Sequence, residues 1–341
     1  MFLIYLFVFV VFALPSETEA NTTLVLHHFV PDTHSPHKNM LVPWAKAVEQ
    51  LSEGKVKIII APGMELGGRP KDLIKQASEG KVDLVWTVNG YSGTTFIRSE
   101  VFELPFVHVN NPVATNLAML EMFESDLKKD YKGLKIMFLH SSQGHAFQSK
   151  GYPIRKPSDL RGKRARTPSR TGAWTLETLK AQPMSVPVRM IPQTLQRRSV
   201  STIMLPFTAN PLLKLQQHIT HMTEGSDGTR FGTAIFQVSM GQKKWNALPP
   251  EIQEAFTKAS GEWIWRKAGQ VWHEDEKRGL ALMTKFKRTH VQLTEKEIEA
   301  FEEALQPVTD RWIKEVEAEG INGKKLVEKA KRLVEKYSSE R

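Results

Sequence analysis

The sequence has 341 residues, and 47 Lys and Arg against 37 Asp and Glu give a net charge of +10 at neutral pH. It contains no cysteine, which excludes disulfide staples, thiolate nucleophiles and cysteine-ligated zinc. The chain is too long for one ordinary hydrophobic core, so we expect two lobes.

Residues 1–20 have the pattern of a secretory signal peptide. An apolar run from Phe2 to Leu14 is followed by Pro15 and a small-residue ending at Ala20. The run is short for a membrane span, but no Lys or Arg precedes it, and an uncleaved anchor is the alternative. We expect a periplasmic protein. Removing this segment takes away two acids and no base, which raises the net charge to +12. The bases are dispersed, so nucleic acid is not expected as a partner.

The first half of the exported chain alternates β-rich runs with helical patterns. Strands are expected at residues 21–29, 55–61 and 82–88, and helices at 38–51 and 70–78. This β-α-β-α-β order, rich in Val and Ile, predicts a mainly parallel sheet covered by helices.

The alternation continues to residue 205 and then gives way to helices. Helices are expected at 112–128, 171–180 and 192–198, and strands at 134–140, 163–167, 184–188 and 201–205. Residues 251–288 contain no proline, and we expect one helix there, long enough at ~1.5 Å per residue to cross two lobes. Residues 295–337 are expected to be helical, with a break at Gly320 to Gly323.

Seven segments, in this order and spacing, resemble the solute-binding proteins of tripartite ATP-independent periplasmic (TRAP) transporters, the DctP-like family. They are HFVPDTHSPH (28–37), PWAKAVEQLSEGKVKI (43–58), EGKVDLVW (79–86), FELPF (102–106), PSDLRGKRARTP (157–168), LPF (205–207) and LPPEIQEAF (248–256). The resemblance runs from Leu24 to Arg311.

This resemblance implies an α/β, two-lobed periplasmic-binding-protein-like fold with a long helix that crosses both lobes. It implies a receptor that closes on one small organic acid and delivers it to the membrane permease of a TRAP transporter. We expect lobe I to comprise residues 21–142 and 229–268. Lobe II is expected to comprise residues 143–228 and 269–341, including the C-terminal helices. We expect a monomer without a cofactor.

Arg166 is the residue that we expect to bind the ligand carboxylate. In the family, the second basic residue of a G-x-K-x-R-x-P pattern points into the cleft, and here the pattern runs from Gly162 to Pro168 with Arg164 replacing its lysine. A guanidinium is always charged, and its planar fork matches a carboxylate. Arg164 and Arg166 share one face of a strand, so the family pattern, not alternation, separates them. A surface basic patch is the alternative.

The remainder of the pocket is expected to be apolar. Where many related receptors have a second arginine this chain has Ala146, and where they have an asparagine it has Leu205. The ligand is therefore expected to be a monocarboxylate, aromatic or branched. Further contacts are expected from residues at predicted strand ends and turns, with core packing or a loop role as the alternative: Trp86 at the end of its strand, Asn89, Tyr91, Phe106, His145, Leu205 and Phe207.

No catalytic residue or metal site is predicted. His27, His28, His34 and His37 lie close in sequence, but adjacent strand residues face opposite ways and no metal-binding carboxylate spacing accompanies them. No nucleophile elbow, P-loop or dinucleotide fingerprint is present. We expect a receptor and not an enzyme. The alternatives are a ligand-sensing protein for a signalling partner and a hydrolase on a similar fold.

Overall fold

The computed structural model describes residues 22–340, so the expected signal peptide lies outside the described residues. The strands are Thr22–His28 (β1), Val56–Ala61 (β2), Leu84–Val88 (β3), Leu134–Ser141 (β4), Ala146–Ser149 (β5), Arg164–Thr167 (β6), Gln182–Ser185 (β7), Thr202–Leu205 (β8), His221–Gly225 (β9), Ile235–Gly241 (β10) and Thr289–Leu293 (β11). The helices are Val42–Leu51 (α1), Leu73–Ser78 (α2), Pro112–Met122 (α3), Arg170–Thr178 (α4), Ile191–Gln196 (α5), Ala209–Leu213 (α6), Gln242–Asn246 (α7), Pro250–Ala259 (α8), Glu262–Lys285 (α9), Glu295–Ala318 (α10) and Gly323–Ser339 (α11).

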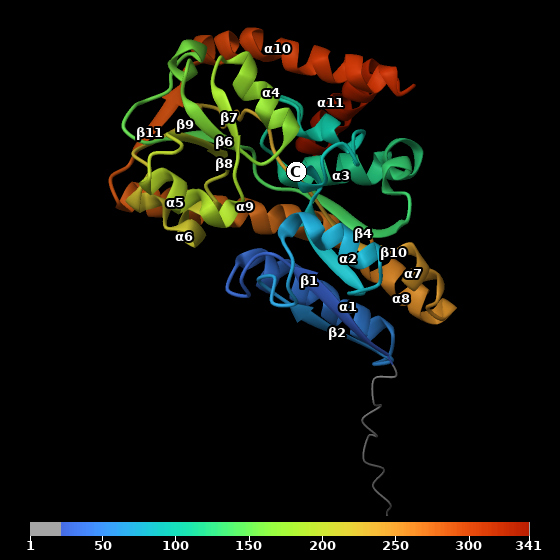
Figure 1. Ribbon diagram of the computed structural model, residues 1–341. Coiled ribbons are helices and arrows are strands. Elements are labelled where there is room, and N and C mark those ends of the chain that lie inside the picture. Colours follow the sequence, from blue (N-terminus) through green and yellow to red (C-terminus); the bar gives the residue numbers. More distant parts are fainter. Residues whose placement is uncertain (1–21, 341) are drawn as a thin grey trace, which may run out of the picture.

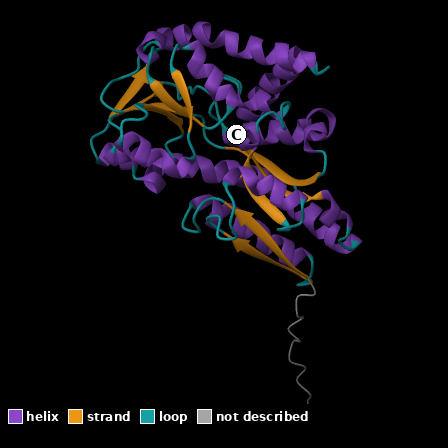
Figure 2. Cartoon of the chain, in the orientation of Figure 1, coloured by secondary structure: helices purple, strands orange, loops and turns teal. Residues whose placement is uncertain are grey.

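Two sheets form the centres of two lobes, and helices cover them (Figures 1 and 2). The first sheet has the order β2-β1-β3-β10-β4, and the second has the order β11-β9-β5-β8-β6-β7. The expected α/β class with two lobes is confirmed. The parallel pairing expected from residues 21–88 is confirmed, because β1 runs parallel to β2 and β3. Antiparallel pairs occur further along the chain, where β10 pairs with β3 and β4, and β5 with β8 and β9.

The direction of β10 follows from the path of the chain. The chain returns from the second sheet through residues 226–234, and β10 starts beside the carboxyl end of β3, where Phe236 pairs with Val88. It must therefore run back along β3, and the crossing between lobes lies at the carboxyl ends of the first sheet. That is the edge where open α/β sheets bind ligands.

The expectation of a single helix over residues 251–288 is wrong, because α8 ends before Gly261 and α9 begins after it. Gly261 adopts an extended backbone with ψ −177°, and the indole Nε1 of Trp44 donates to Ser260 Oγ at 3.1 Å. The break lets α8 pack on α1. The 24 residues of α9, about 36 Å long, still reach both lobes, as expected, and α9 crosses the middle of the molecule in Figure 1.

Two glycines let α9 lie directly against backbone in each lobe. A Cβ at Gly269 would lie 2.6 Å from the backbone nitrogen of Val113, at the start of α3. A Cβ at Gly279 would overlap the carbonyl oxygen of Phe207, in the loop between β8 and α6. The position of that loop is therefore set by α9.

The sheets divide the chain near the expected lobe boundaries, which stay a prediction. The first sheet draws its strands from residues 22–141 and 235–241, and the second from residues 146–225 and 289–293. α10 packs against α4 of the second lobe, whereas α11 packs against α3 of the first. The strand expected at 184–188 lies two residues earlier, as β7. Within the described residues, no helix is both long and apolar enough to span a membrane.

Candidate ligand-binding site

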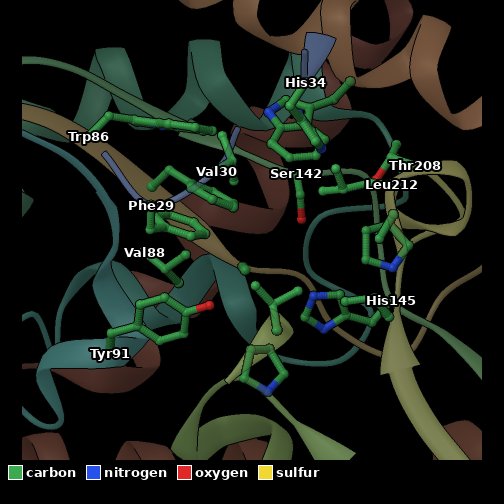
Figure 3. A pocket seen from close by; sticks show the side chains of 18 of the residues that line it. Phe29, Val30, His34, Trp86, Val88, Tyr91, Ser142, His145, Thr208 and Leu212 are labelled. Atoms are coloured by element: carbon green, nitrogen blue, oxygen red, sulfur yellow. The ribbon is translucent and has the colours of Figure 1, made fainter. Parts of the chain in front are cut away.

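A small cavity lies between the two lobes, at the carboxyl ends of strands from both sheets (Figure 3). Its volume is about 70 Å³, which is room for a handful of waters or for a small ligand. Aromatic and aliphatic side chains make up most of its wall. The lining residues are Phe29, Val30, His34, Trp86, Val88, Tyr91, Ser142, His145, Arg166, Pro168, Val188, Leu205, Pro206, Thr208, Ala209, Leu212, Ala234, Phe236 and Trp272.

Arg166, on β6, is a buried cation without an acidic partner among residues 22–340. Its side chain is 1% exposed, its Nε donates to the carbonyl oxygen of Val186 at 3.1 Å, and its Nη1 has no hydrogen-bond partner in the described chain. Burial lowers the pKa of this guanidinium, against an opposing effect of Tyr91. A buried, unpaired guanidinium is costly and has a strong tendency to bind an anion.

The structure also separates Arg166 from Arg164, which alternation alone could not do. Arg164 is exposed at the start of β6, and its Nη2 donates to the carbonyl oxygen of Arg198 at 2.7 Å. Only Arg166 of this pair reaches the cavity wall.

Two neutral polar side chains, Tyr91 and His145, lie near Arg166. The Tyr91 hydroxyl points into the cavity in Figure 3, and burial raises its pKa. His145 is 3% exposed, and burial, followed by the charge of Arg166, holds its pKa well below the usual value. Both groups can therefore donate a hydrogen bond to an anion bound at Arg166 without adding charge of their own.

Aromatic rings from the first lobe and α9 form one wall of the cavity. The ring of Trp86 stacks on Phe29 with centroids 5.6 Å apart and on Phe236 at the same distance. The ring of Trp272, from α9, packs against Phe236, with the two ring centroids 5.3 Å apart. The indole Nε1 of Trp86 donates to His140 Nε2 at 2.9 Å, which fixes its orientation. Such a wall suits a flat ring.

The structure therefore brings five of the predicted site residues to one cavity: Trp86, Tyr91, His145, Arg166 and Leu205. Trp86 was expected at the end of its strand, and this detail is wrong because β3 continues to Val88.

The other three predicted residues, Asn89, Phe106 and Phe207, are placed away from the lining. The amide Nδ2 of Asn89 donates to Tyr131 Oη at 2.8 Å, and its Oδ1 accepts from Gln237 at 2.8 Å, so its polar group is used inside the first lobe. Phe106 packs edge-on against Phe231. Phe207 is fully buried with the guanidinium of Arg230 4.3 Å from its ring centroid.

Several lining residues were not predicted from the sequence. Phe29 follows β1 directly, so the strand-end rule that selected Trp86 could also have selected it. His34, Thr208 and Trp272 come from two loops and from the middle of α9. No local pattern marks them, because only the tertiary fold brings these segments together.

A buried ionic network holds the loop that follows β8 and carries Thr208. The guanidinium of Arg230 binds Glu224 through Nε at 2.7 Å and pairs with Glu276 of α9 at 2.8 Å. Glu276 Oε2 in turn accepts the backbone N–H of Thr208 at 2.8 Å. The wall of the second lobe is thus anchored to α9 by a paired, hydrogen-bonded set of charges.

The clustered histidines do not form a metal centre within residues 22–340, where no group of three or more potential ligands is close enough to hold a metal ion. His28 Nε2 instead lies 2.8 Å from His37 Nδ1. Burial lowers the pKa of His28 to about 3, so it is neutral at ordinary pH.

A cavity between two α/β lobes, with one buried cation and aromatic walls, is the arrangement of a solute-binding protein. The family model of bacterial extracellular solute-binding proteins, family 7 (DctP), matches residues 26–315. The chain belongs to this family.

Solved structures with the same fold cover nearly the whole chain. A TRAP solute-binding protein from Rhodoferax ferrireducens T118, in complex with copurified benzoate, is 29% identical with a TM-score of 0.88, covering 93% of this chain and 98% of that one. A marine metagenome TRAP solute-binding protein specific for aromatic acid ligands, in complex with 3-hydroxybenzoate, has the same identity, TM-score and coverage. The outer membrane transporter protein TsaT of Comamonas testosteroni is 22% identical over 326 residues, 93% of each chain.

Proposed function

We propose that this protein is the extracytoplasmic receptor of a TRAP-type transporter and that its ligand is a small aromatic monocarboxylate. The observation that carries the proposal is the buried guanidinium of Arg166, which faces a small aromatic cavity and lacks an acidic partner within residues 22–340. A carboxylate would supply the missing negative charge and accept two parallel N–H bonds.

The composition of the cavity wall favours one carboxylate over two. Arg166 is the only lysine or arginine among the lining residues of the described chain. A second carboxylate would therefore be buried without a cation, at a cost of several kcal/mol. The benzoate and 3-hydroxybenzoate found in the two relatives with 29% identity support the same ligand class.

In this proposal six of the lining residues contact the ligand in defined ways. Arg166 binds the carboxylate, and Tyr91 and His145 donate to it. Trp86 and Phe29 stack on the ring, and Leu205 closes the cavity from the other lobe. Because the ligand would contact both lobes, binding favours the closed form, which a membrane permease then recognises.

The family and its relatives are solute-binding proteins, and we propose that the chain performs no turnover. The cavity wall in the described residues carries no Asp, Glu, Lys or Cys. Its one serine, Ser142, donates to the carbonyl oxygen of Gln143 at 2.9 Å and has no paired base. A bound acid should be recovered chemically unchanged after long incubation.

A thermal-shift screen of the exported chain tests the ligand class. The panel would contain aromatic monocarboxylates, aliphatic dicarboxylates, sugar acids, neutral sugars and amines. A ligand at 100 times its Kd adds about 2.7 kcal/mol to the free energy of unfolding, which raises Tm by several degrees. Shifts confined to aromatic monocarboxylates support the proposal. The largest shifts with dicarboxylates, neutral sugars or amines would contradict it.

A further inference from the structure

The cavity has a second polar end, away from Arg166. Thr208 is 5% exposed, His34 is 9% exposed, and both line the wall. Thr208 Oγ1 and His34 Nδ1 are buried and have no hydrogen-bond partner among the described residues. Figure 3 shows both side chains across the cavity from Tyr91, whose hydroxyl neighbours Arg166.

Unpartnered polar atoms are uncommon in protein interiors, because a buried donor or acceptor without a hydrogen bond is destabilising. Thr208 has little freedom to move and find another partner. Its backbone N–H is bound by Glu276 Oε2 at 2.8 Å, and Gly279 of α9 lies against the same stretch of backbone. The ring of His34 is likewise packed against Trp272, with the two ring centroids 6.2 Å apart. The two groups are therefore held in place on the cavity wall without a hydrogen-bond partner from the described residues.

The chemistry of this end selects a neutral group. Burial lowers the pKa of His34 to about 4, so its imidazole is uncharged at neutral pH. A neutral imidazole and a hydroxyl can each donate or accept one hydrogen bond. Arg278 lines the adjoining groove together with His34 and Thr208, but its guanidinium is paired with Asp275. An anionic group at this end would therefore find no free cation among the described residues.

We propose that Thr208 and His34 form a second subsite that binds a hydroxyl group of the ligand. The ligand is then a hydroxylated aromatic monocarboxylate, with its carboxylate at Arg166 and its hydroxyl between Thr208 and His34. This inference rests on the proposed function, since it presupposes an aromatic acid in the cavity.

Calorimetric titration of the exported chain with benzoate, 3-hydroxybenzoate and 4-hydroxybenzoate tests the subsite. The unmodified protein should bind at least one hydroxy acid roughly tenfold more tightly than benzoate, because one buried hydrogen bond contributes on this scale. In Thr208→Val and in His34→Phe this preference should fall to about twofold or less. Valine has the shape of threonine, and Thr208 Oγ1 has no partner to lose within the described residues, so the variant should fold.

Thr223→Val is the matched control. Thr223 Oγ1 is also buried without a partner among residues 22–340, but it lies on β9, outside the cavity lining. This variant should keep the full preference. Equal affinities for the three acids in the unmodified protein, or a preference that survives both cavity substitutions, would overturn the subsite and leave the receptor proposal standing. Failure of all three acids to bind would instead contradict the proposed function, and the subsite with it.

Discussion

At the scale of single residues, Arg166 is a charge that the fold buries without a partner from the described chain. Its position on β6, 1% exposed, deprives it of water, and the neutral groups beside it, the carbonyl oxygen of Val186 and the hydroxyl of Tyr91, supply no negative charge. Such a residue weakens the ligand-free protein. The carboxylate of a bound ligand would supply the negative charge that the guanidinium of Arg166 lacks.

The first prediction concerns this buried, unpaired charge. Arg166→Met should lose about 2–5 kcal/mol of binding free energy for an aromatic acid, because the carboxylate is left unpaired in the cavity. The same substitution should raise the Tm of the ligand-free protein by a few degrees, since it removes an uncompensated buried charge. Calorimetric titration and scanning calorimetry measure the two effects.

Arg164→Met supplies the control for this pair of measurements. It removes a guanidinium from the same strand, but an exposed one that is bonded to the carbonyl oxygen of Arg198. It should change neither affinity nor Tm appreciably. Tight binding by the Arg166 variant would remove that residue from the site.

The sequence predicted the site residues unevenly, for physical reasons. Arg166 stands in a family pattern, and Trp86 lies near the carboxyl end of a recognisable strand. Asn89 and Phe207 were expected at the site because they lie in a loop and a turn that follow predicted strands. Their partners, Gln237 and Arg230, come from distant segments, and these decide which way the side chains point.

At the scale of elements, α9 positions the cavity wall of the second lobe. Gly279 touches the backbone at Phe207, and Glu276 binds the N–H of Thr208. Gly269 makes the corresponding contact with α3 in the first lobe. The two glycines therefore connect one rigid helix to both halves of the molecule.

The second prediction compares these glycines. Gly279→Ala should push the loop at residues 205–209 outward and weaken binding of an aromatic acid, with overpacking that costs about 1–3 kcal/mol. Gly269→Ala should lower the free energy of unfolding by a similar amount but have a smaller effect on affinity, because its contact is with α3 and not with the cavity wall. Urea unfolding and titration of both variants separate the effects. Unchanged affinity in Gly279→Ala would contradict the role given to α9.

The third prediction concerns a contact between the lobes. Arg189 follows β7 in the second lobe, and its Nη2 donates to the carbonyl oxygen of Phe29 in the first at 2.6 Å. Arg189→Met should favour the open form and weaken ligand binding by up to about tenfold, the scale of one hydrogen bond near the surface. Small-angle X-ray scattering should give a larger radius of gyration for the ligand-free variant than for the ligand-free unmodified protein. The control is Arg197→Met, which changes an exposed arginine at the end of α5. Equal ligand affinities in the two variants would contradict a role for the contact between Arg189 and Phe29 in closing the lobes.

The elements themselves were predictable where their signals are local. Apolar residues at strand or helix spacing mark β1, β2, α1 and α3 in the sequence. The antiparallel direction of β10 depends on where the chain crosses between lobes, which no local pattern records. The break between α8 and α9 lies at Ser260 and Gly261, where Ser260 accepts a hydrogen bond from Trp44, 216 positions away.

At the scale of the whole molecule, buried histidines tie stability to pH. Burial lowers the pKa to about 3 in His28, His108 and His140, and to about 4 in His34. Between these values and 6.5 the unfolded chain binds protons that the folded chain does not. The stability that these neutral histidines contribute is therefore complete above about pH 6.5 and is lost as pH falls below it. Glu103 opposes this trend, because burial raises its pKa to about 8 and its protonation favours the folded form.

The fourth prediction is a net loss of roughly 4 kcal/mol in the free energy of unfolding between pH 7.5 and 5.5, because the five buried histidines, His145 included, outweigh Glu103. His108→Asn should reduce the loss by about 1.4 kcal/mol, one histidine's share. Urea unfolding at the two pH values measures both, with the exposed His273→Gln as control. Greater stability at pH 5.5 would contradict the assignment of neutral buried histidines.

A crystal structure of the complex with benzoate would show whether Arg166 binds the carboxylate of an aromatic acid inside the cavity. Both carboxylate oxygens should lie about 2.7–2.9 Å from the guanidinium of Arg166, with the ring against Trp86 and Phe29. A benzoate whose carboxylate lies away from Arg166, or which binds outside this cavity, would contradict this prediction.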